Sequence, residues 1–350
     1  MAASKNILSE IIVVDNNSTD GSCAMILKKF PQIILLRKTE NTGFSKANNL
    51  GVNKAKGAYI LILNPDTVVA EDTFEKVINY SETKNKFGTI GVKYIDGTGN
   101  FLPECKRNFP SVGVACKKIL GFSNKYYANH IGENENKEVD VLCGAFMLLK
   151  RDVYNKVGGF DEDYFMYGED VDLSYKLTKG GYKNYYYGGA TIIHYKGEST
   201  IKDINYLKNF YGAMKIFYRK HYEISKLGYY SMNVFFKGIM NYQLLRRNDS
   251  EKQPLSGNNF IYVGSDFESY EKVKSHLQAE TSEFCSTPPV KIEDYDLIIL
   301  DTTSISFSEI IRIHGNLRSV KIRKRIRPEN TNFLIGSDSS RSRGDILELL

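Results

Sequence analysis

The 350-residue sequence contains no tryptophan, few prolines and only five cysteines. No two cysteines form a CxxC pair; they are Cys23, Cys105, Cys116, Cys143 and Cys285. An odd number of scattered cysteines argues against a disulfide framework and against a zinc site. It fits a reducing compartment such as the cytosol.

Long apolar runs are also missing. No window reaches the roughly 18 uncharged apolar residues that a membrane-spanning helix needs. The first ten residues, "MAASKNILSE", lack the apolar core of a signal peptide. We therefore expect a cytoplasmic location. With 42% hydrophobic and 25% charged residues the composition is that of a globular protein, and the length suggests about two domains.

The net charge of +6 is not spread along the chain. Residues 201–250 carry nine Lys/Arg and three Asp/Glu, whereas residues 1–200 carry 25 and 23 and residues 251–350 carry 13 and 15. A nucleic-acid-binding protein would be expected to show its basic surface on the main fold. The local excess therefore predicts no nucleic-acid partner and makes residues 201–250 a region of interest.

Residues 1–203 alternate strand-like and helix-like segments, which predicts an α/β fold with a parallel sheet covered on both faces. The strand-like segments include "EIIVVD", "QIILLRK", "AYILILN" and "NYYYGGATIIHYKGEST". Between them lie segments with helical spacing, among them one that enters a helix near Glu169 and stops at Gly180 and Gly181. In such sheets ligands bind beyond the carboxyl ends of the strands.

The pattern changes after residue 203. Residues 204–245 begin with a basic, aromatic amphipathic helix and continue with a short apolar run. Residues 246–257 have linker composition. Residues 258–350 form a smaller Rossmann-like α/β unit without a GxGxxG motif, so we expect no cofactor there. Its last stretch, "RGDILELL", is predicted to be helical, and its abrupt end suggests an incomplete unit.

Polar residues stand where several predicted strands end. Asp15, Asp66 and His194 each follow an apolar strand, and Glu169 and Asp170 arrive on a loop that enters a helix. A carboxylate at the tip of a buried strand is well positioned and only partly solvated. It suits a hard divalent cation that also binds a diphosphate.

Five segments occur in an order that resembles the family 2 glycosyltransferases of the GT-A fold, particularly the rhamnosyltransferase-like branch of surface-polysaccharide synthesis. The resemblance covers about residues 8–225. Its segments are "IIVVDNNSTDGS", "ENTGFSKANNLG", "YILILNPDTVV", "CGAFMLLKRDVYNKVGGFDEDYFMYGEDVDLSYKL" and "IIHYKGEST".

The resemblance implies an inverting transfer of a sugar, rhamnose in this branch, from a nucleotide diphosphate to a saccharide or lipid-linked acceptor. Asp170, with Glu169 beside it, matches the catalytic base. Asp66 in "NPD" takes the metal side of the DxD motif, and His194 is a further candidate ligand for Mg²⁺ or Mn²⁺. The residues that match the nucleotide side are Asp15, Asn17, Gly43, Phe44, Asn48 and Asn64.

Each residue also has a plain structural interpretation. Asp15 is suited to an Asx turn and Asp66 to a turn after proline. The acids of "GEDVD" suit the positive end of a helix, and for Asp172 we favour this interpretation. A lone histidine at a strand end, such as His194, is often structural. The basic aromatic helix can pack as a core helix, bind an anionic membrane surface, or do both.

The family resemblance starts one strand late. Family members begin with a further strand and helix before the segment that matches Glu10. We therefore expect a sheet without its first strand, and a protein that is poorly soluble or inactive alone. This makes an N-terminally truncated, non-catalytic relic or partner-binding subunit the alternative to an enzyme. A nucleotidyltransferase fits less well, because its Gly-rich N-terminal loop is absent.

Overall fold

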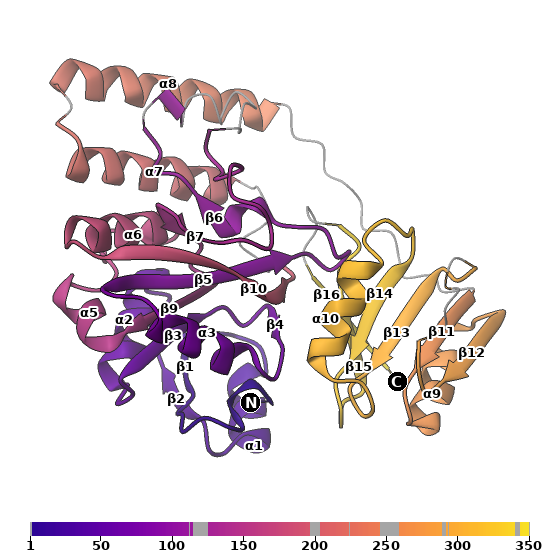
Figure 1. The fold of residues 1–350 in the computed structure, drawn as a ribbon. Coiled ribbons are helices and arrows are strands. Elements are labelled where there is room, and N and C mark those ends of the chain that lie inside the picture. The colour runs from indigo at the N-terminus through magenta and orange to yellow at the C-terminus, as the bar shows by residue number, and fades with distance from the viewer. Residues whose placement is uncertain are drawn as a thin grey trace.

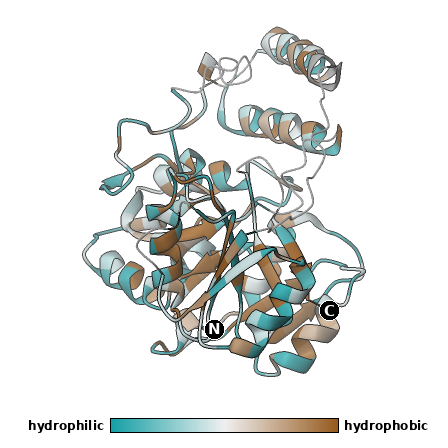
Figure 2. Cartoon of the chain, turned by 90° about the vertical axis from the view of Figure 1, so that its right-hand side faces the viewer, coloured by the Kyte–Doolittle hydropathy of each residue, from teal (hydrophilic) through white to brown (hydrophobic). Residues whose placement is uncertain are grey.

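The structure is a computed structural model in which two six-stranded sheets lie side by side and a helical hairpin lies over the first of them (Figure 1). It describes residues 2–111, 113–114, 125–196, 204–223, 225–245, 259–288, 292, 294–339 and 344–349. The strands of both sheets are largely hydrophobic, and many outward-facing helical residues are hydrophilic (Figure 2).

The chain begins with a small parallel unit. A single 3₁₀ turn precedes two strands that pair only with each other among the described residues, and their helices follow them in sequence. The elements are η1 (Ala2–Ser4), β1 (Ile12–Asp15), α1 (Ser22–Lys29), β2 (Ile34–Arg37) and α2 (Gly43–Lys54). The alternation of strand and helix is as predicted, and Gly21 is the N-cap residue of α1.

The first large sheet has the order β3-β9-β5-β10-β4, and β7 pairs with β10 off this path. Its strands are β3 (Tyr59–Leu63), β4 (Thr67–Val69), β5 (Phe87–Ile95), β7 (Asn136–Glu138), β9 (Phe146–Lys150) and β10 (Lys183–His194). Only β5 and β10 run parallel, and the other pairs are antiparallel. The expectation of a parallel sheet is therefore wrong for this sheet. Helix–strand alternation breaks after β3, since β4 follows β3 directly, and β3, β4, β7 and β9 all pair antiparallel with their neighbours.

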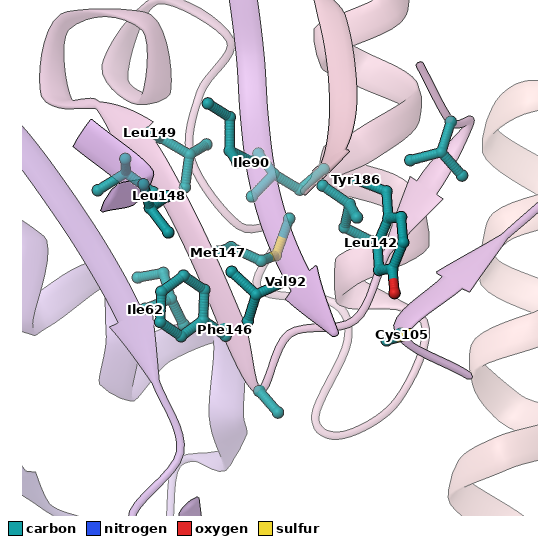
Figure 3. Close-up of a cluster of buried hydrophobic side chains, with 14 of the residues drawn as sticks. Ile62, Ile90, Val92, Cys105, Leu142, Phe146, Met147, Leu148, Leu149 and Tyr186 are labelled. Carbon is teal, nitrogen blue, oxygen red and sulfur yellow. The ribbon is translucent and has the colours of Figure 1, made fainter. Parts of the chain in front are cut away.

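Buried side chains from β3, β5, β9 and β10 form the main core (Figure 3). Residues such as Ile90 and Leu149 are fully buried. Helix α3 (Thr73–Glu82) packs on β5 and β10, and α5 (Arg151–Lys156) packs beside β9. The described chain between β5 and β9 includes β7 and the short elements η2 (Pro103–Cys105), β6 (Lys106–Arg107) and β8 (Val141–Leu142).

Three helices surround the remaining face. Helix α6 (Glu169–Lys179) begins at Glu169 and is followed by Gly180 and Gly181, as predicted. Helix α7 (Ile204–His221) is the amphipathic helix expected from the sequence. The apolar run after it is not short, because it belongs to the 20-residue helix α8 (Lys226–Leu245). Both faces of α8 carry apolar residues, which hid its helical period.

The second large sheet has the order β12-β11-β13-β14-β15-β16 and is parallel from β12 to β14. Its elements are β11 (Asn259–Val263), α9 (Phe267–Leu277), β12 (Thr281–Cys285), β13 (Leu297–Asp301), α10 (Phe307–Asn316), β14 (Arg323–Arg327), β15 (Phe333–Gly336) and β16 (Asp345–Glu348). The predicted helix in "RGDILELL" is wrong. This stretch forms β16, an edge strand that gains its hydrogen bonds from antiparallel pairing with β15.

The two large sheets share a hydrophobic core. Val68, Ile193 and Tyr195 of the first sheet pack in one cluster with Ile311 and Ile313 of α10. The N-terminal amides of α10 are also capped across the interface, since the Glu71 carboxylate accepts from Phe307 N at 2.7 Å and Ser308 N at 3.0 Å. The predicted linker, residues 246–257, lies outside the described residues, and the domain boundaries stay predictions.

Across the part of the chain that the structure describes, no helix combines the length and the apolar character needed to cross a membrane.

Candidate active site

The turn formed by Cys143, Gly144 and Ala145 is the meeting point of the site. The Ala145 carbonyl accepts from Asn64 N at 3.0 Å, which ties the turn to the tip of β3. The Gly144 amide donates to Asp170 Oδ2 at 3.0 Å. A Cβ atom on Gly144 would lie 3.5 Å from Asp170 Cβ and 3.7 Å from the Phe44 ring. The strand tip, the helix acid and the Phe44 segment therefore converge here.

Asp170 is held by an arginine that the sequence reasoning missed. Arg107 Nη2 lies 2.5 Å from Asp170 Oδ2 and also donates to the Leu142 carbonyl at 3.1 Å. The two side chains are only 11% and 10% exposed. Their 63-residue separation leaves no pattern in the sequence. The only available signal was the charge of the adjacent acids, because buried carboxylates need a counter-ion.

Glu169 lies beside this pair, and no ion pair with Glu169 is found among the described residues. It is 7% exposed, and its Oε2 has no hydrogen-bond partner among the described residues. Burial, followed by the charge of Asp170, raises the pKa of Glu169 to about 8. Its carboxyl group therefore holds a proton near neutral pH, whereas Asp170 is engaged as an acceptor by Arg107 and Gly144.

Asp66 and His194 lie together. Asp66 Oδ1 is 3.3 Å from His194 Nε2, because β10 pairs with β4 and sets His194 opposite Thr67. The Tyr94 ring packs edge-on to the imidazole, and its hydroxyl donates to the Cys143 carbonyl at 3.1 Å. Tyr94 thereby links this pair to the central turn.

A metal ion could be held by these two residues together with a ligand. They offer one carboxylate oxygen and one imidazole nitrogen with partly exposed side chains. Within the described ranges no group of three or more His, Cys, Asp or Glu residues gathers that could hold a metal ion. An octahedral ion would therefore take its other positions from water or from phosphate oxygens, as Mg²⁺ commonly does.

The segment before α2 is fixed to the end of β1 by Asn16. The Asn16 side chain donates to Asn41 Oδ1 at 2.9 Å and accepts from Thr42 N at 2.9 Å. Gly43 follows with a φ of +83°, and a Cβ atom there would lie 2.4 Å from the Phe165 carbonyl oxygen. The position therefore requires glycine. Phe44 N donates to the same carbonyl at 2.7 Å.

The other residues assigned to the nucleotide side make local contacts. Asp15 accepts from Ser18 N at 3.2 Å, and hydrogen bonding from the Ser18 side chain lowers the pKa of Asp15. Asn17 has a φ of +69°, which places it in the left-handed region. Asn48 donates to the Phe44 carbonyl at 2.9 Å. These contacts match the turn interpretation of Asp15, and they leave any nucleotide role as a prediction.

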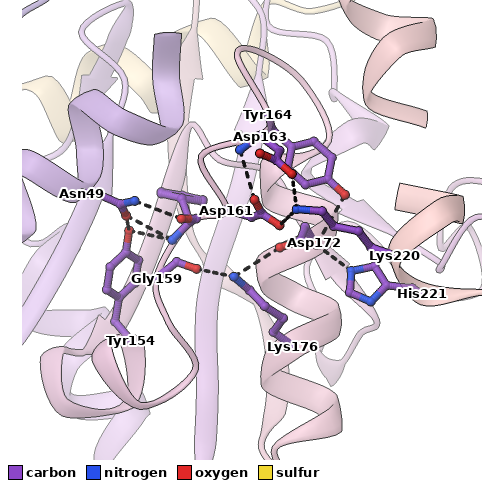
Figure 4. A network of polar contacts seen from close by, with 11 residues as sticks. Asn49, Tyr154, Gly159, Asp161, Asp163, Tyr164, Asp172, Lys176, Lys220 and His221 are labelled. Atoms are coloured by element: carbon purple, nitrogen blue, oxygen red, sulfur yellow. Dashed lines mark hydrogen bonds and ion pairs between the residues drawn. The ribbon is translucent and has the colours of Figure 1, made fainter. Parts of the chain in front are cut away.

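Asp172 belongs to a buried polar network (Figure 4). It is fully buried and pairs with His221 Nε2 at 2.6 Å and Lys176 Nζ at 3.2 Å. The favoured interpretation, in which Asp172 only complements the helix dipole, is therefore incomplete. The ion pair with His221 also joins the end of α7 to α6. Lys220 reinforces this with an ion pair to Asp161.

Asn49 was also missed. Its side chain donates to the Phe160 carbonyl at 2.9 Å and accepts from Phe160 N at 3.1 Å, across more than 100 residues of sequence. It also accepts from the Tyr154 hydroxyl at 2.5 Å (Figure 4). Asn49 therefore ties α2 to the start of the 159–168 loop, which leads to Glu169.

Residues 3–158 match the sequence model of glycosyl transferase family 2. The matched region contains β1 to β9 and the central turn, and it is similar in sequence to this family. Among its relatives, the N-acetylglucosaminyl-diphospho-decaprenol L-rhamnosyltransferase of Mycobacterium tuberculosis is 27% identical over 211 residues, 55% of this chain and 68% of that protein. The rhamnosyltransferase WbbL of Escherichia coli is 31% identical over 161 residues, 44% of this chain and 61% of that protein.

A solved structure with a similar course is the mannosyltransferase PcManGT of Pyrobaculum calidifontis in complex with GDP-Man and Mn²⁺. It shares 18% identity and a TM-score of 0.43, covering 67% of this chain and 59% of that chain. This likeness is too distant to assign a function.

Proposed function

We propose that the chain is an inverting glycosyltransferase that moves a sugar from a nucleotide diphosphate to a saccharide or lipid-linked acceptor. The observation that carries the proposal is the convergence at the Cys143–Gly144–Ala145 turn. Asp170, the tip of β3 and the Phe44 ring meet there, and Tyr94 links the turn to His194 and so to Asp66. The match of residues 3–158 to the sequence model of glycosyl transferase family 2 supports a glycosyl transfer at this convergence.

Asp170 is our candidate for the general base. It would take the proton from the acceptor hydroxyl as that oxygen bonds to the anomeric carbon from the face opposite the diphosphate. The bond from the anomeric carbon to the diphosphate breaks, and the electron pair leaves with the diphosphate. Arg107 holds and orients the Asp170 carboxylate, since its guanidinium lies 2.5 Å away.

Glu169 is the second candidate for the general base, because its pKa is raised. A pKa of about 8 makes its conjugate base a better proton acceptor than an ordinary carboxylate near neutral pH. It lies one residue before Asp170 in the first turn of α6. The family resemblance favours Asp170 as the base. A protonated Glu169 would instead be a neutral neighbour that adds no negative charge beside Asp170.

The donor would lie between the Asn16–Gly43 segment and the tip of β3. Gly43 allows the Phe165 backbone to approach closely there. The family resemblance places Asp15, Asn17, Phe44, Asn48 and Asn64 on the same side. When bound at Asp66 and His194, Mg²⁺ or Mn²⁺ would supply positive charge to the departing diphosphate. Asp66 and His194 would hold it, and Pro65 would keep the approach of Asp66 stiff.

The sugar and setting come from the relatives. Two of them are named as rhamnosyltransferases, and another, GgaB of Bacillus subtilis, is named as a minor teichoic acid biosynthesis protein. These names support rhamnose as the first donor to try, and surface-polysaccharide synthesis as the setting. The matched regions cover between 22% and 68% of these three proteins, so the activity of the whole chain is part of the proposal.

Titration with nucleoside diphosphates separates the enzyme from a non-catalytic relic. We expect dTDP or UDP to bind in the presence of Mn²⁺, and a panel of nucleotide sugars to show slow hydrolysis of one member. Asp66→Ala should weaken Mn²⁺-dependent nucleotide binding by roughly tenfold to a hundredfold, the range known for disturbed metal sites. Wild-type transfer that is equally fast with a chelator would contradict the metal role. Absence of nucleotide binding would favour the relic.

The outer face of α8 is our candidate for contact with an anionic membrane. Leu227, Tyr230 and Val234 are 78%, 68% and 55% exposed at helical spacing, while Met232 and Phe236 of the opposite face are buried in a cluster shared with α7. Exposed Lys226 and Lys237 flank the apolar stripe. An apolar stripe beside lysines suits an interfacial helix, and a lipid-linked acceptor would be met at such a surface.

Liposome flotation tests this contact. Each lysine near an anionic surface contributes about 1 kcal/mol, so Lys226→Gln/Lys237→Gln should weaken binding to anionic vesicles by roughly an order of magnitude or more. A control pair on α9, Lys272→Gln/Lys274→Gln, removes the same charge elsewhere and should bind as the wild type does. Equal binding to neutral and anionic vesicles would refute an electrostatic contact.

A further inference from the structure

A cavity of about 680 Å³ lies at the interface of the two large sheets, away from the candidate active site. One wall is the turn of residues 96–100, which follows β5. The other wall comes from residues 318–324 and 337–339, around the starts of β14 and the end of β15. A volume of several hundred cubic ångströms is typical of small-molecule sites. The shared core on both sides makes the cavity part of the folded structure.

Lys324 is the unusual residue in its wall. It is 2% exposed, and its Nζ donates to the Thr98 carbonyl at 3.1 Å and the Ile322 carbonyl at 3.2 Å. No carboxylate in the described part of the chain forms an ion pair with it. Burial lowers the pKa of Lys324 to about 8. An ammonium group has three donors, so one stays available to a ligand.

The carboxylates that line the cavity are mostly committed elsewhere. Asp338 accepts from both terminal nitrogens of Arg325, at 2.7 and 3.1 Å. Asp96 Oδ1 accepts from Thr98 N, Thr98 Oγ1 and Asn100 N, at 2.9, 2.6 and 2.9 Å. Asp296 adds a further exposed acid to the lining.

Besides Lys324, two exposed basic side chains of the lining are Arg318 and Lys321. Arg323 also lines the cavity but already has a partner. Arg318 has a long contact of 3.6 Å with Glu133, and both of these side chains are substantially exposed. Exposed pairs of this kind contribute little and are readily exchanged for a stronger partner. The cavity therefore presents an excess of available positive charge.

We propose that this interdomain cavity binds a small phosphate-bearing molecule, with Lys324 at its floor and Arg318 and Lys321 at its rim. A phosphate group carries several charged oxygens and can accept from cations on more than one side, which suits this arrangement better than a single carboxylate. Asn100 lines the same space, and its side-chain amide has a second N–H besides the one donated to Thr98 Oγ1. The site is separate from the donor site and does not depend on it.

Calorimetric titration with inorganic pyrophosphate in a chelator tests the proposal, because the chelator removes the metal-dependent donor site. We expect wild type and Asp66→Ala to bind pyrophosphate alike. Arg318→Gln/Lys321→Gln should bind about tenfold more weakly or worse, because charge-assisted hydrogen bonds are lost. The matched control, Lys272→Gln/Lys274→Gln, also removes two positive charges, but from α9, which lies between β11 and β12 in sequence. It should bind pyrophosphate as the wild type does.

Three results would overturn the proposal. They are no pyrophosphate binding by the wild type, unchanged binding by Arg318→Gln/Lys321→Gln, and an equal loss in the α9 control. Lys324→Met, checked for its fold by circular dichroism, gives a second reading, since folded protein that binds like the wild type would also refute the site. Binding of dTDP with Mn²⁺ by these variants reports on the proposed glycosyl transfer separately.

Parallel titrations identify the kind of ligand. Phosphate, pyrophosphate, a nucleoside monophosphate and glycerol phosphate all present phosphate groups, but they differ in the group to which the phosphate is attached. A nucleoside monophosphate that binds most tightly would indicate a soluble nucleotide, and glycerol phosphate would indicate a lipid headgroup. Each would have to lose affinity in Arg318→Gln/Lys321→Gln, and retention by that variant counts against the cavity.

Discussion

The first region of the chain and the C-terminal sheet each contain a buried arginine close to two acids, Arg107 in the first and Arg327 in the second, with different results. At the end of β14, Arg327 Nη1 lies 3.0 Å from Asp301 and 3.2 Å from Asp266, so both acids share one cation. In the candidate active site, the described ion pair of Arg107 is with Asp170 and not with Glu169, whose pKa is raised to about 8.

This difference shows what an acid at the end of a strand means in each place. In the C-terminal sheet the charges satisfy one another, and the Tyr262 hydroxyl donates to Asp301 as well. Such a cluster stabilises the sheet and has little left to offer a substrate. In the first region a buried acid with no described ion pair, Glu169, adjoins a paired one, Asp170, and acids with perturbed pKa values of this kind are typical of functional sites. The two clusters therefore differ in the partners of their acids, not in the acids themselves.

The largest expected effect comes from Asp170→Asn. Loss of a general base costs typically 10²- to 10⁴-fold in rate, so transfer should fall by about that factor while nucleotide binding persists. Asp301→Asn is the matched change in the other cluster and should lower stability without touching the chemistry of transfer. Radiolabelled sugar transfer and nucleotide titration measure the two effects. Near-normal transfer by Asp170→Asn would exclude it from the mechanism.

The sequence predicted the places of the acids but not their partners. The start of α6 at Glu169, the strand tip before Asp66 and the end of β10 at His194 follow from local patterns of apolar and polar residues. Arg107, Asn16 and Asn49 act across 25 to 113 residues, and no local period encodes such contacts. The mixed first sheet and strand β16 were missed because strand pairing decides them.

Removal of the arginines should sharpen the comparison at the level of stability. Breaking a buried ion pair by deleting one partner costs about 3–5 kcal/mol, because an uncompensated charge is left behind. We expect Arg327→Met and Arg107→Met each to lower the free energy of unfolding within that range, measured by urea denaturation. Only Arg107→Met should also alter the pH profile of transfer. A changed profile in Arg327→Met would break the distinction.

The smallest effect concerns Glu169 and pH. Its folded-state pKa of about 8 lies above the ordinary value of 4.5, so the folded protein holds a proton that the unfolded chain releases. The stability that this proton provides is complete below about pH 4.5 and is lost as the pH rises through 8. The loss is on the order of a few kcal/mol.

Glu169→Gln cannot release a proton, so we expect its unfolding free energy to fall less than that of the wild type between pH 5 and pH 9. Urea denaturation at the two pH values measures this. Glu75→Gln, a change of an exposed acid on α3, serves as the control and should follow the wild type. Parallel pH curves for Glu169→Gln and the wild type would show that the buried carboxyl has no unusual affinity for its proton.

The shared core of the two large sheets has a consequence for the newly synthesised chain. The patch of Val68, Ile193 and Tyr195 leaves the ribosome before Ile311 and Ile313, which cover it. At the 5–20 residues per second of protein synthesis, the intervening stretch of about 120 residues takes roughly 6–24 s. During that interval the nascent chain exposes a hydrophobic surface beside the strands of the candidate active site. Chaperones bind surfaces of this kind. The last quarter of the protein therefore ends a period of vulnerability that begins while the first sheet is already folding.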